Sequence, residues 1–223
     1  MIDSFSNDTA SQRRMRLAAC LLVLGLALGG CKTGMPGMAD SFGKPAAPVT
    51  LPRDQASLHR FSEDWGRRYD ANRADKNTAL TYARSLHALG RNTQAVAVLQ
   101  GLAIENPEDM QVLSAYGKAL ADAGQLKQAA DILTRAHTPE RPDWSVLSTQ
   151  GSIADQLGDH DAARGYYDTA LKIHPNDPGV LSNLGLSYAL SQQLPKAEET
   201  LRLAASQPDA DERVRQNLAL VLG

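Results

Sequence analysis

The sequence predicts an all-α fold, a solenoid of stacked antiparallel helix pairs, and three observations support this prediction. Small residues recur at steps of 34 positions, most regularly in the column Ala95, Ala129, Ala163 and Ala197. Glycines fill further columns of the same period, namely Gly90, Gly124 and Gly158 and then Gly117, Gly151 and Gly185. Between them, apolar residues repeat at helical spacing. Self-similarity at such a period indicates repeated supersecondary units that bury their apolar faces against one another.

Four full repeats follow from this frame, spanning 76–109, 110–143, 144–177 and 178–211. In the second repeat Leu113, Tyr116 and Leu120 form the apolar stripe of a first helix, and Ile132, Leu133 and Ala136 form that of a second. Two helices approach to about 8–10 Å only where their facing side chains are small. The Gly and Ala columns therefore predict tight packing within each hairpin.

The predicted helix ends also repeat. Gly90, Gly124 and Gly158 are placed where each first helix should end, a position that favours Gly because the residue after the C-cap often has a left-handed backbone. The second helices should end before prolines, since Pro cannot continue the hydrogen-bond ladder, and these prolines are Pro107, Pro175 and Pro208.

The fourth repeat resembles the tetratricopeptide repeat (TPR) family in detail. It reads Leu181-Ser-Asn-Leu184-Gly185-Leu-Ser-Tyr188 and continues with Ala197, Leu201 and Ala204 at the spacing of that family. The resemblance covers roughly 130 residues. It implies that the domain extends over 56–223, with half-repeats at both ends of the four full repeats.

The two half-repeats are less regular than the repeats between them. A helix over 56–72 carries Trp65 in the column of Leu99, Leu133, Tyr167 and Leu201, so we expect Trp65 to seal the end of the stack; the alternative is a binding aromatic. A helix over 211–222 places Val214, Leu218 and Leu222 on its packing side, whereas Leu220 lies off that face. Either this cap is imperfect, a partner covers it, or the chain is truncated at Gly223.

Composition and motifs exclude several function classes. A formal charge of −2 provides no basic stripe for nucleic acid. The five histidines lack metal-ligand spacing, and no catalytic motif is present. His160 lies between Asp159 and Asp161, a pattern that could serve proton chemistry, but we expect an ordinary turn there. The sequence therefore predicts a binding protein rather than an enzyme, with no metal, no cofactor and no small-molecule substrate.

The N-terminal region has the pattern of a lipoprotein signal peptide. Arg13, Arg14 and Arg16 precede an apolar run of about a dozen residues, which is too short to span a membrane. The run ends in Leu28-Gly29-Gly30-Cys31, which resembles the bacterial lipobox. This resemblance implies a signal peptide over 1–30 and lipidation of Cys31; the alternative is an incidental Cys after an uncleaved anchor.

The segment 31–55 is rich in Gly and Pro and is expected to be a flexible tether. Lys32 follows the lipobox Cys where Asp would favour retention in the inner membrane. The resemblance to lipoproteins therefore implies a lipid anchor in the outer membrane, at its periplasmic face.

The TPR resemblance implies that the first helices of the repeats line a concave groove that binds protein partners. We call the following set the candidate groove residues: Asn77, Arg84, His87, Gln111, Lys118, Asp122, Ser152, Asp155, Ser182 and Leu186. Chaperone-binding members hold a carboxylate with Lys and Asn in the first repeat, where this chain has Leu80 and Arg84. Such a clamp is not expected. Charge falls and apolarity rises along the set, and three of its charged members, Arg84, Lys118 and Asp155, are expected to face solvent.

A narrower resemblance comes from the C-terminal part. The segments Asn183-Leu-Gly-Leu-Ser-Tyr-Ala-Leu190, Lys196-Ala-Glu198 and Arg213-Val-Arg-Gln-Asn-Leu-Ala-Leu-Val-Leu-Gly223 resemble the TadD-type TPR lipoproteins of tight-adherence (Flp) pilus assembly. This implies an interaction scaffold for pilus assembly and secretion, pilotin-like toward the outer-membrane secretin. The alternative is a general cell-envelope TPR lipoprotein that serves outer-membrane assembly or peptidoglycan enzymes.

Overall fold

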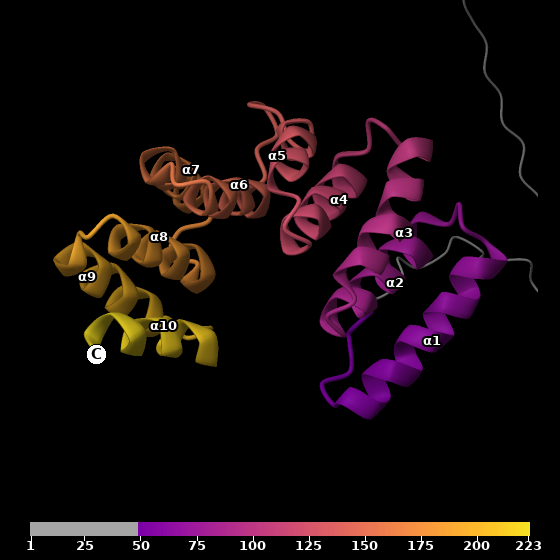
Figure 1. The fold of residues 1–223 in the computed structure, drawn as a ribbon, viewed down its shortest axis with the longest axis horizontal. Coiled ribbons are helices and arrows are strands. Elements are labelled where there is room, and N and C mark those ends of the chain that lie inside the picture. The colour runs from indigo at the N-terminus through magenta and orange to yellow at the C-terminus, as the bar shows by residue number, and fades with distance from the viewer. Residues whose placement is uncertain (1–48) are drawn as a thin grey trace, which may run out of the picture. The chain divides into compact units, whose positions relative to one another are not determined.

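The computed structural model describes residues 49–223, and this part of the chain is all-helical, without a strand (Figure 1). The predicted fold class, a TPR-like solenoid of helix pairs, is confirmed. The helices in order are α1 (Gln55–Ala71), α2 (Lys76–Ala88), α3 (Asn92–Glu105), α4 (Met110–Asp122), α5 (Leu126–Thr134), α6 (Trp144–Gln156), α7 (His160–Ile173), α8 (Pro178–Leu190), α9 (Leu194–Ala205) and α10 (Glu212–Leu222).

The helices follow the 34-residue period of the sequence. The first helices of the four repeats, α2, α4, α6 and α8, begin at the residues where that period starts each repeat. The second helices, α3, α5, α7 and α9, begin 34 residues apart as well, at Asn92, Leu126, His160 and Leu194. Each helix packs on the next one along the chain (Figure 1).

The glycine column at Gly117, Gly151 and Gly185 explains how closely the two helices of a repeat pack. A methyl group added to Gly117 would lie 2.5 Å from Leu133, and one added to Gly151 would lie 2.5 Å from the ring of Tyr167. Both distances are far below van der Waals contact, so only Gly leaves room for the large side chain of the facing helix. The predicted role of this column agrees with the structure.

The turn within each repeat is closed in the same way four times. The amide of Gly90 donates to His87 (2.8 Å) and the amide of Arg91 donates to Leu86 (2.8 Å), which is the paired hydrogen bonding of a Schellman motif. This motif needs a positive φ at its Gly, and the three turn glycines have φ of 71°, 75° and 86°. In the fourth repeat Gln192 takes this position with φ 61°.

A second column of capping residues was not recognised in the sequence. The first helix of each repeat, and α10 after them, begins after an Asp whose side chain accepts a backbone N–H of the first turn within 3.2 Å. These residues are again 34 apart and would have been visible as a column: Asp75, Asp109, Asp143, Asp177 and Asp211.

Repeat 2 departs from the regular pattern because α5 ends at Thr134, although its period would carry it to residue 139. Pro139 stands there, and its ring would clash with the carbonyl of residue 135 in a continued helix. The chain instead makes a turn in which the Thr138 and Arg141 backbones pair. Ala136, which the sequence places on the second helix, therefore lies beyond it, although it is buried.

α1 packs differently from the prediction. Leu58, Ser62 and Gly66 are its buried residues, whereas Trp65 is only half-buried. The ring of Trp65 lies tilted against that of Phe61, with the two centroids 5.8 Å apart. In the later repeats, the residue equivalent to Trp65 packs against the first helix of its own repeat. Within the described residues, no such first helix precedes α1. Trp65 is therefore not the buried seal that its column suggested.

At the other end, α10 packs on both α8 and α9. Val214 is buried as predicted, but Leu222, which was expected on the packing side, is half exposed. Leu220 is exposed as well. The side chain of Asn217 donates to the Ser182 hydroxyl at 2.9 Å. α10 therefore packs on α8 in the same way as the first helix of each repeat packs on the first helix of the repeat before it.

Candidate partner-binding groove

The four first helices form one side of the helix stack. α2 contacts α4, α4 contacts α6, and α6 contacts α8, whereas no two second helices contact each other within the described residues. Successive units come closest on the inner side of a curved stack, so the first helices line that side. Candidate groove residues at equivalent positions of these helices are thereby brought onto one surface.

Most candidate residues of repeats 1 and 2 line a shared cavity. This α2–α4 hollow has a volume of about 390 Å³, with Ala95 and Leu99 of α3 as its floor. Five candidates meet in it: Arg84, His87, Gln111, Lys118 and Asp122. His87 Nδ1 and Asp122 Oδ2 lie 3.2 Å apart across the opening, and both side chains are about half exposed. The Arg84 guanidinium donates to the Val49 carbonyl at 2.6 Å, so the segment before α1 reaches this end of the groove.

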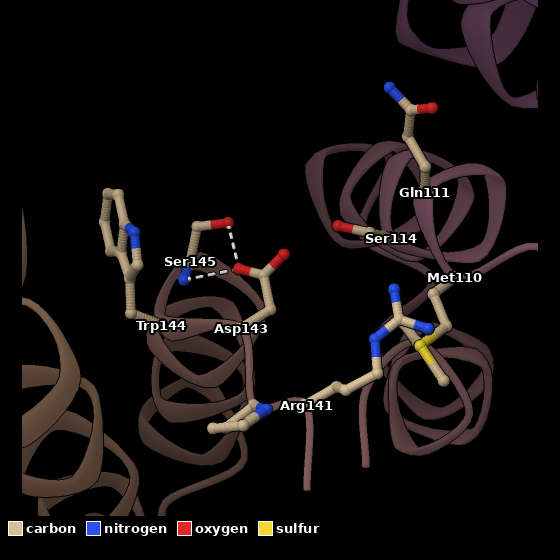
Figure 2. A pocket seen from close by; sticks show the side chains of 9 residues that line it. Met110, Gln111, Ser114, Arg141, Asp143, Trp144 and Ser145 are labelled. Carbon is tan, nitrogen blue, oxygen red and sulfur yellow. Dashed lines mark hydrogen bonds between the residues drawn. The ribbon is translucent and has the colours of Figure 1, made fainter. Parts of the chain in front are cut away.

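A second cavity lies where the N-terminal halves of α4 and α6 meet the turn of residues 135–143 (Figure 2). This turn hollow measures about 530 Å³ and is lined by Met110, Gln111, Ser114, Ala136, Arg141, Pro142, Asp143, Trp144 and Ser145. It shares Gln111 and Ser114 with the α2–α4 hollow, so the two cavities adjoin. Lys118 Nζ donates to Ser145 Oγ at 2.8 Å and thereby links α4 to α6.

The electrostatics of the turn hollow centre on Asp143 and Lys118. Burial would raise the pKa of Asp143, but hydrogen bonds from Ser145 and from the backbone of Val146, together with the Lys118 charge, hold this pKa below its ordinary value. Burial lowers the pKa of Lys118, and the nearby Asp143 and Asp122 oppose that shift. Asp143 is therefore a fixed anion, while Lys118 is a cation that is incompletely compensated.

A third cavity repeats the first one two repeats further on. This α6–α8 hollow has a volume of about 320 Å³ and contains the candidates Ser152, Asp155 and Leu186, together with Gln156, Tyr167, Asn183 and Leu190. Its members lie 68 residues after the corresponding members of the α2–α4 hollow, as Ser152 does after Arg84. The helices thus build the same depression twice with different side chains.

Asp155 is the centre of a polar cluster in this hollow. Its carboxylate accepts from the Tyr167 hydroxyl at 3.0 Å and from the Ser187 hydroxyl at 2.7 Å, and it lies 2.8 Å from His160 Nδ1. The Asp155 side chain is only 9% exposed. Burial and the adjacent carboxylate raise the pKa of Tyr167 far above its ordinary value, so its hydroxyl remains a donor. His160, expected to be an ordinary turn residue, belongs to this cluster.

Several candidates are not placed as the sequence suggested. Asp155 was expected to face solvent and is instead nearly buried, because Tyr167 and Ser187 close over it. Lys118 is half-buried, and of the four charged candidates Arg84 and Asp122 are exposed. Ser182 is fully buried because α10 covers it. Asn77 is exposed at the start of α2 and lines none of the three hollows.

Sequence reasoning missed Arg141 and Trp144, which line the turn hollow. Arg141 belongs to the non-helical connection that Pro139 creates, and Trp144 is the first residue of α6 directly after it. The doublet of Pro139 and Pro142 was the signal that could have revealed this connection. Trp144 stacks on His174 with ring centroids 4.6 Å apart, so it also contributes to the packing of repeat 3.

The remaining predictions concern the N-terminal anchor, metal binding and membrane-spanning segments. Cys31, the signal peptide 1–30 and most of the tether lie outside the described residues. Within residues 49–223 no cluster of His, Cys, Asp and Glu could hold a metal ion. No helix of this part is both long and apolar enough to cross a bilayer.

Comparison with known proteins agrees with the repeat frame. Models of the family described as "Tetratricopeptide repeat" match residues 80–143 and 156–221. Human protein O-mannosyl-transferase TMTC1 is 29% identical over 165 residues, which are 71% of this chain and 19% of that protein. The chain thus spans about a fifth of the length of this curated relative.

Solved structures share the fold at low sequence identity. TTC0263, a thermophilic TPR protein of Thermus thermophilus, matches with a TM-score of 0.65 at 20% identity, over 75% of this chain and 91% of that one. MamA matches with a TM-score of 0.56 at 17% identity, over 74% and 92% of the two chains. YrrB, described as a TPR protein with an unusual peptide-binding site, matches with a TM-score of 0.51 at 16% identity, over 72% and 82%. The chain is a tetratricopeptide-repeat protein.

Proposed function

We propose that this chain is a lipid-anchored interaction scaffold of the cell envelope, whose groove binds an extended segment of a protein partner. The observation that carries the proposal is the series of three hollows along one row of helices. Together they offer cations, hydroxyls and the exposed Leu190 on a single surface. Concave surfaces of stacked repeats are suited to long, linear ligands, because each repeat contributes one set of side chains.

The chemistry of these hollows favours binding over catalysis. The hollows are open depressions whose polar groups are fixed by hydrogen bonds to neighbouring helices, as Lys118 is to Ser145. The fold neighbour YrrB has a peptide-binding site, and TPR proteins bind protein partners. A peptide that lies along the groove would replace water on both apolar and polar surface, which is the usual composition of a non-obligate interface.

We further propose that the partner is a component of the tight-adherence (Flp) pilus machine, with the outer-membrane secretin as the first candidate. The support is the sequence resemblance of residues 183–190, 196–198 and 213–223 to TadD-type lipoproteins. Lipidation at Cys31 would place the groove near the periplasmic face of the outer membrane, where a secretin assembles. About 25 tether residues would separate the two by roughly 25–30 Å.

The test is complementation of a deletion strain with groove variants of the full chain. The groove variant combines Arg84→Ala with Gln111→Ala, since both side chains are exposed in the α2–α4 hollow. Its matched control combines Lys127→Ala with Gln94→Ala, which likewise removes one cation and one glutamine, here from exposed positions on α5 and α3 that line none of the hollows. Surface pili, secretin multimers and the level of the protein are measured together.

We expect the groove variant to lose pili and secretin multimers at an unchanged protein level, and the control to retain them. Normal piliation of the deletion strain would refute the pilus assignment and favour the general envelope scaffold. Full activity of the groove variant would refute binding through this surface.

The anchor is tested separately with Cys31→Ser. This variant should remain an uncleaved precursor and leave the outer-membrane fraction, because several acyl chains at about 0.8 kcal/mol per buried CH₂ make anchoring effectively permanent. Outer-membrane fractionation of Cys31→Ser with continued acyl labelling would refute the lipoprotein assignment.

A further inference from the structure

We propose that the turn hollow binds an acidic side chain of the partner segment, and that Arg141 is the residue that recognises it. This inference rests on the proposed function, because it names the chemistry of the ligand that the same groove takes.

Arg141 is held in place by its own backbone. Its amide donates to the Thr138 carbonyl at 3.0 Å and lies 3.2 Å from the Thr138 hydroxyl, while its carbonyl accepts from the Thr138 amide at 3.3 Å. Pro139 and Pro142 restrict the remaining backbone of this turn. The base of the side chain is thus fixed, which reduces the entropy lost when its guanidinium binds an anion.

The guanidinium of Arg141 has no hydrogen-bond or ion-pair partner among the described residues, and Figure 2 shows it extending toward Met110 at the start of α4. The neighbouring carboxylate of Asp143 is engaged elsewhere. It accepts from the Ser145 amide at 2.8 Å, the Ser145 hydroxyl at 2.7 Å and the Val146 amide at 3.2 Å. Arg141 therefore presents five free donors in a geometry that matches a carboxylate.

The surroundings add to the attraction for an anion. Lys118 lies at the edge of this hollow through its bond to Ser145, and burial leaves its charge incompletely solvated. Asp143 and Asp122 partly offset the charge of Lys118, whereas the Arg141 guanidinium has no carboxylate partner among the described residues. Ser114 and Gln111 supply further donors from α4. An incoming carboxylate would be attracted by the unpaired charge of Arg141 and would find several hydrogen-bond donors.

The position of the hollow indicates an internal acidic side chain rather than a chain terminus. On one side it continues into the α2–α4 hollow through Gln111 and Ser114, and on the other side α6 leads to the α6–α8 hollow. A segment that occupies the groove must pass through the turn hollow without ending there. Leu186 and the exposed Leu190 favour apolar residues in the partner segment, on the side of the acidic residue that lies toward α8.

The experiment measures peptide binding to the full chain by fluorescence anisotropy. The first probe is a labelled twelve-residue Gly/Ser peptide with a blocked C-terminus that carries one central Glu followed by two Leu. The second probe replaces Glu with Gln, and the third carries Gln and ends in a free carboxylate. The protein variants are Arg141→Ala and, as a control that removes one exposed cation from α7, Lys172→Ala.

We expect the Glu probe to bind the natural chain about tenfold more tightly than the Gln probe, as a charge-assisted hydrogen bond allows. Arg141→Ala should abolish this ratio, and Lys172→Ala should preserve it. Circular dichroism should show the same melting temperature for Arg141→Ala, since this side chain makes no contact that folding needs.

Equal affinity of the Glu and Gln probes, including no binding of either, would overturn the proposal. So would tighter, Arg141-dependent binding of the probe with a free carboxylate, because the site would then take a chain terminus. If acid selectivity fails while the groove variant of the preceding subsection still loses its pili, only this inference fails and the scaffold function stands.

Discussion

The α2–α4 hollow and the α6–α8 hollow are the same site built twice, 68 residues apart, from different side chains. Arg84 and Lys118 of the first correspond to Ser152 and Leu186 of the second. The first keeps an exposed His87–Asp122 pair, whereas the second buries Asp155 under Tyr167 and Ser187. Glycines and alanines at fixed positions set the shape of the groove, and the variable positions set its chemistry. A ligand that fills both hollows must be polar at one end and apolar at the other.

The largest expected difference between the two hollows concerns their carboxylates. Asp155→Ala would leave the hydroxyls of Tyr167 and Ser187 without their acceptor, which should reduce the free energy of unfolding by about 2–3 kcal/mol. Asp122→Ala removes only an exposed pair with His87 and should cost less than about 0.5 kcal/mol. Urea unfolding followed by circular dichroism measures both, and equal losses would contradict the structural role of Asp155.

The second difference concerns the glycines beneath the hollows. Gly151→Ala would place a methyl group against the Tyr167 ring, which its hydrogen bond to Asp155 holds in place, at a cost of about 1–3 kcal/mol. Gly117→Ala meets the Leu133 side chain at the same distance, and no hydrogen bond holds that side chain in place, so its cost should be smaller. Gly165→Ala is the control, because it has open space on α7 and should be neutral or slightly stabilising. Thermal unfolding of the three variants would refute this ranking if Gly117→Ala were the least stable.

The third prediction concerns Asp143, the N-cap residue of α6, which lies between the two hollows. Its pKa lies below the ordinary value of 3.8, so the folded state binds fewer protons than the unfolded chain in this range. The stability that the Asp143 charge contributes is therefore fully present above the unfolded-state pKa of 3.8. It is lost as the pH falls through the lower pKa of the folded state. Asp143→Asn keeps a capping oxygen that does not titrate, so its urea midpoint should fall less steeply than that of the natural chain between about pH 5 and pH 2.

Asp143→Ala serves as the matched comparison for this prediction, since it removes the cap at every pH and should lose about 1 kcal/mol at neutral pH. An Asp143→Asn protein with the pH slope of the natural chain would show that the charge of this cap contributes nothing.

The smallest expected effect distinguishes the fourth repeat from the first three. Gln192 holds a left-handed backbone where the others have Gly, and Gln192→Gly should stabilise the chain by about 0.5 kcal/mol. The reverse change, Gly158→Ala at φ 86°, should destabilise it by about 1 kcal/mol. Differential scanning calorimetry on both variants would contradict this account if Gln192→Gly lowered the melting temperature.

The repeat architecture could be predicted because it depends on local and periodic signals. Gly151 and its column predict close helix packing, and Gly90 and its column predict the turns, without knowledge of any distant contact. The early end of α5 also has a local cause, namely Pro139. It was not predicted, because the 34-residue period places a full-length helix there. The same frame contained the Asp capping column, which went unnoticed.

The candidate groove residues were harder to predict because accessibility depends on neighbouring repeats. Asp155 is an exposed position on an isolated helix, and it becomes buried only when Tyr167 of α7 and Ser187 of α8 close over it. Ser182 is buried by α10, whose packing position a single repeat does not reveal. The Arg141 turn belongs to no repeat column, so the pattern that found the other residues could not find this one.

Site-specific photo-crosslinking in cells tests most directly the claim that one extended partner occupies both hollows. A photoreactive residue is placed in the full chain at Gln111, at Leu190 or at Lys172, which are exposed in the α2–α4 hollow, the α6–α8 hollow and on α7, respectively. We expect the same partner to be crosslinked from Gln111 and from Leu190, through neighbouring residues of one segment, and not from Lys172. Crosslinking of that partner from Lys172 alone, or of unrelated proteins from the two hollows, would contradict the account.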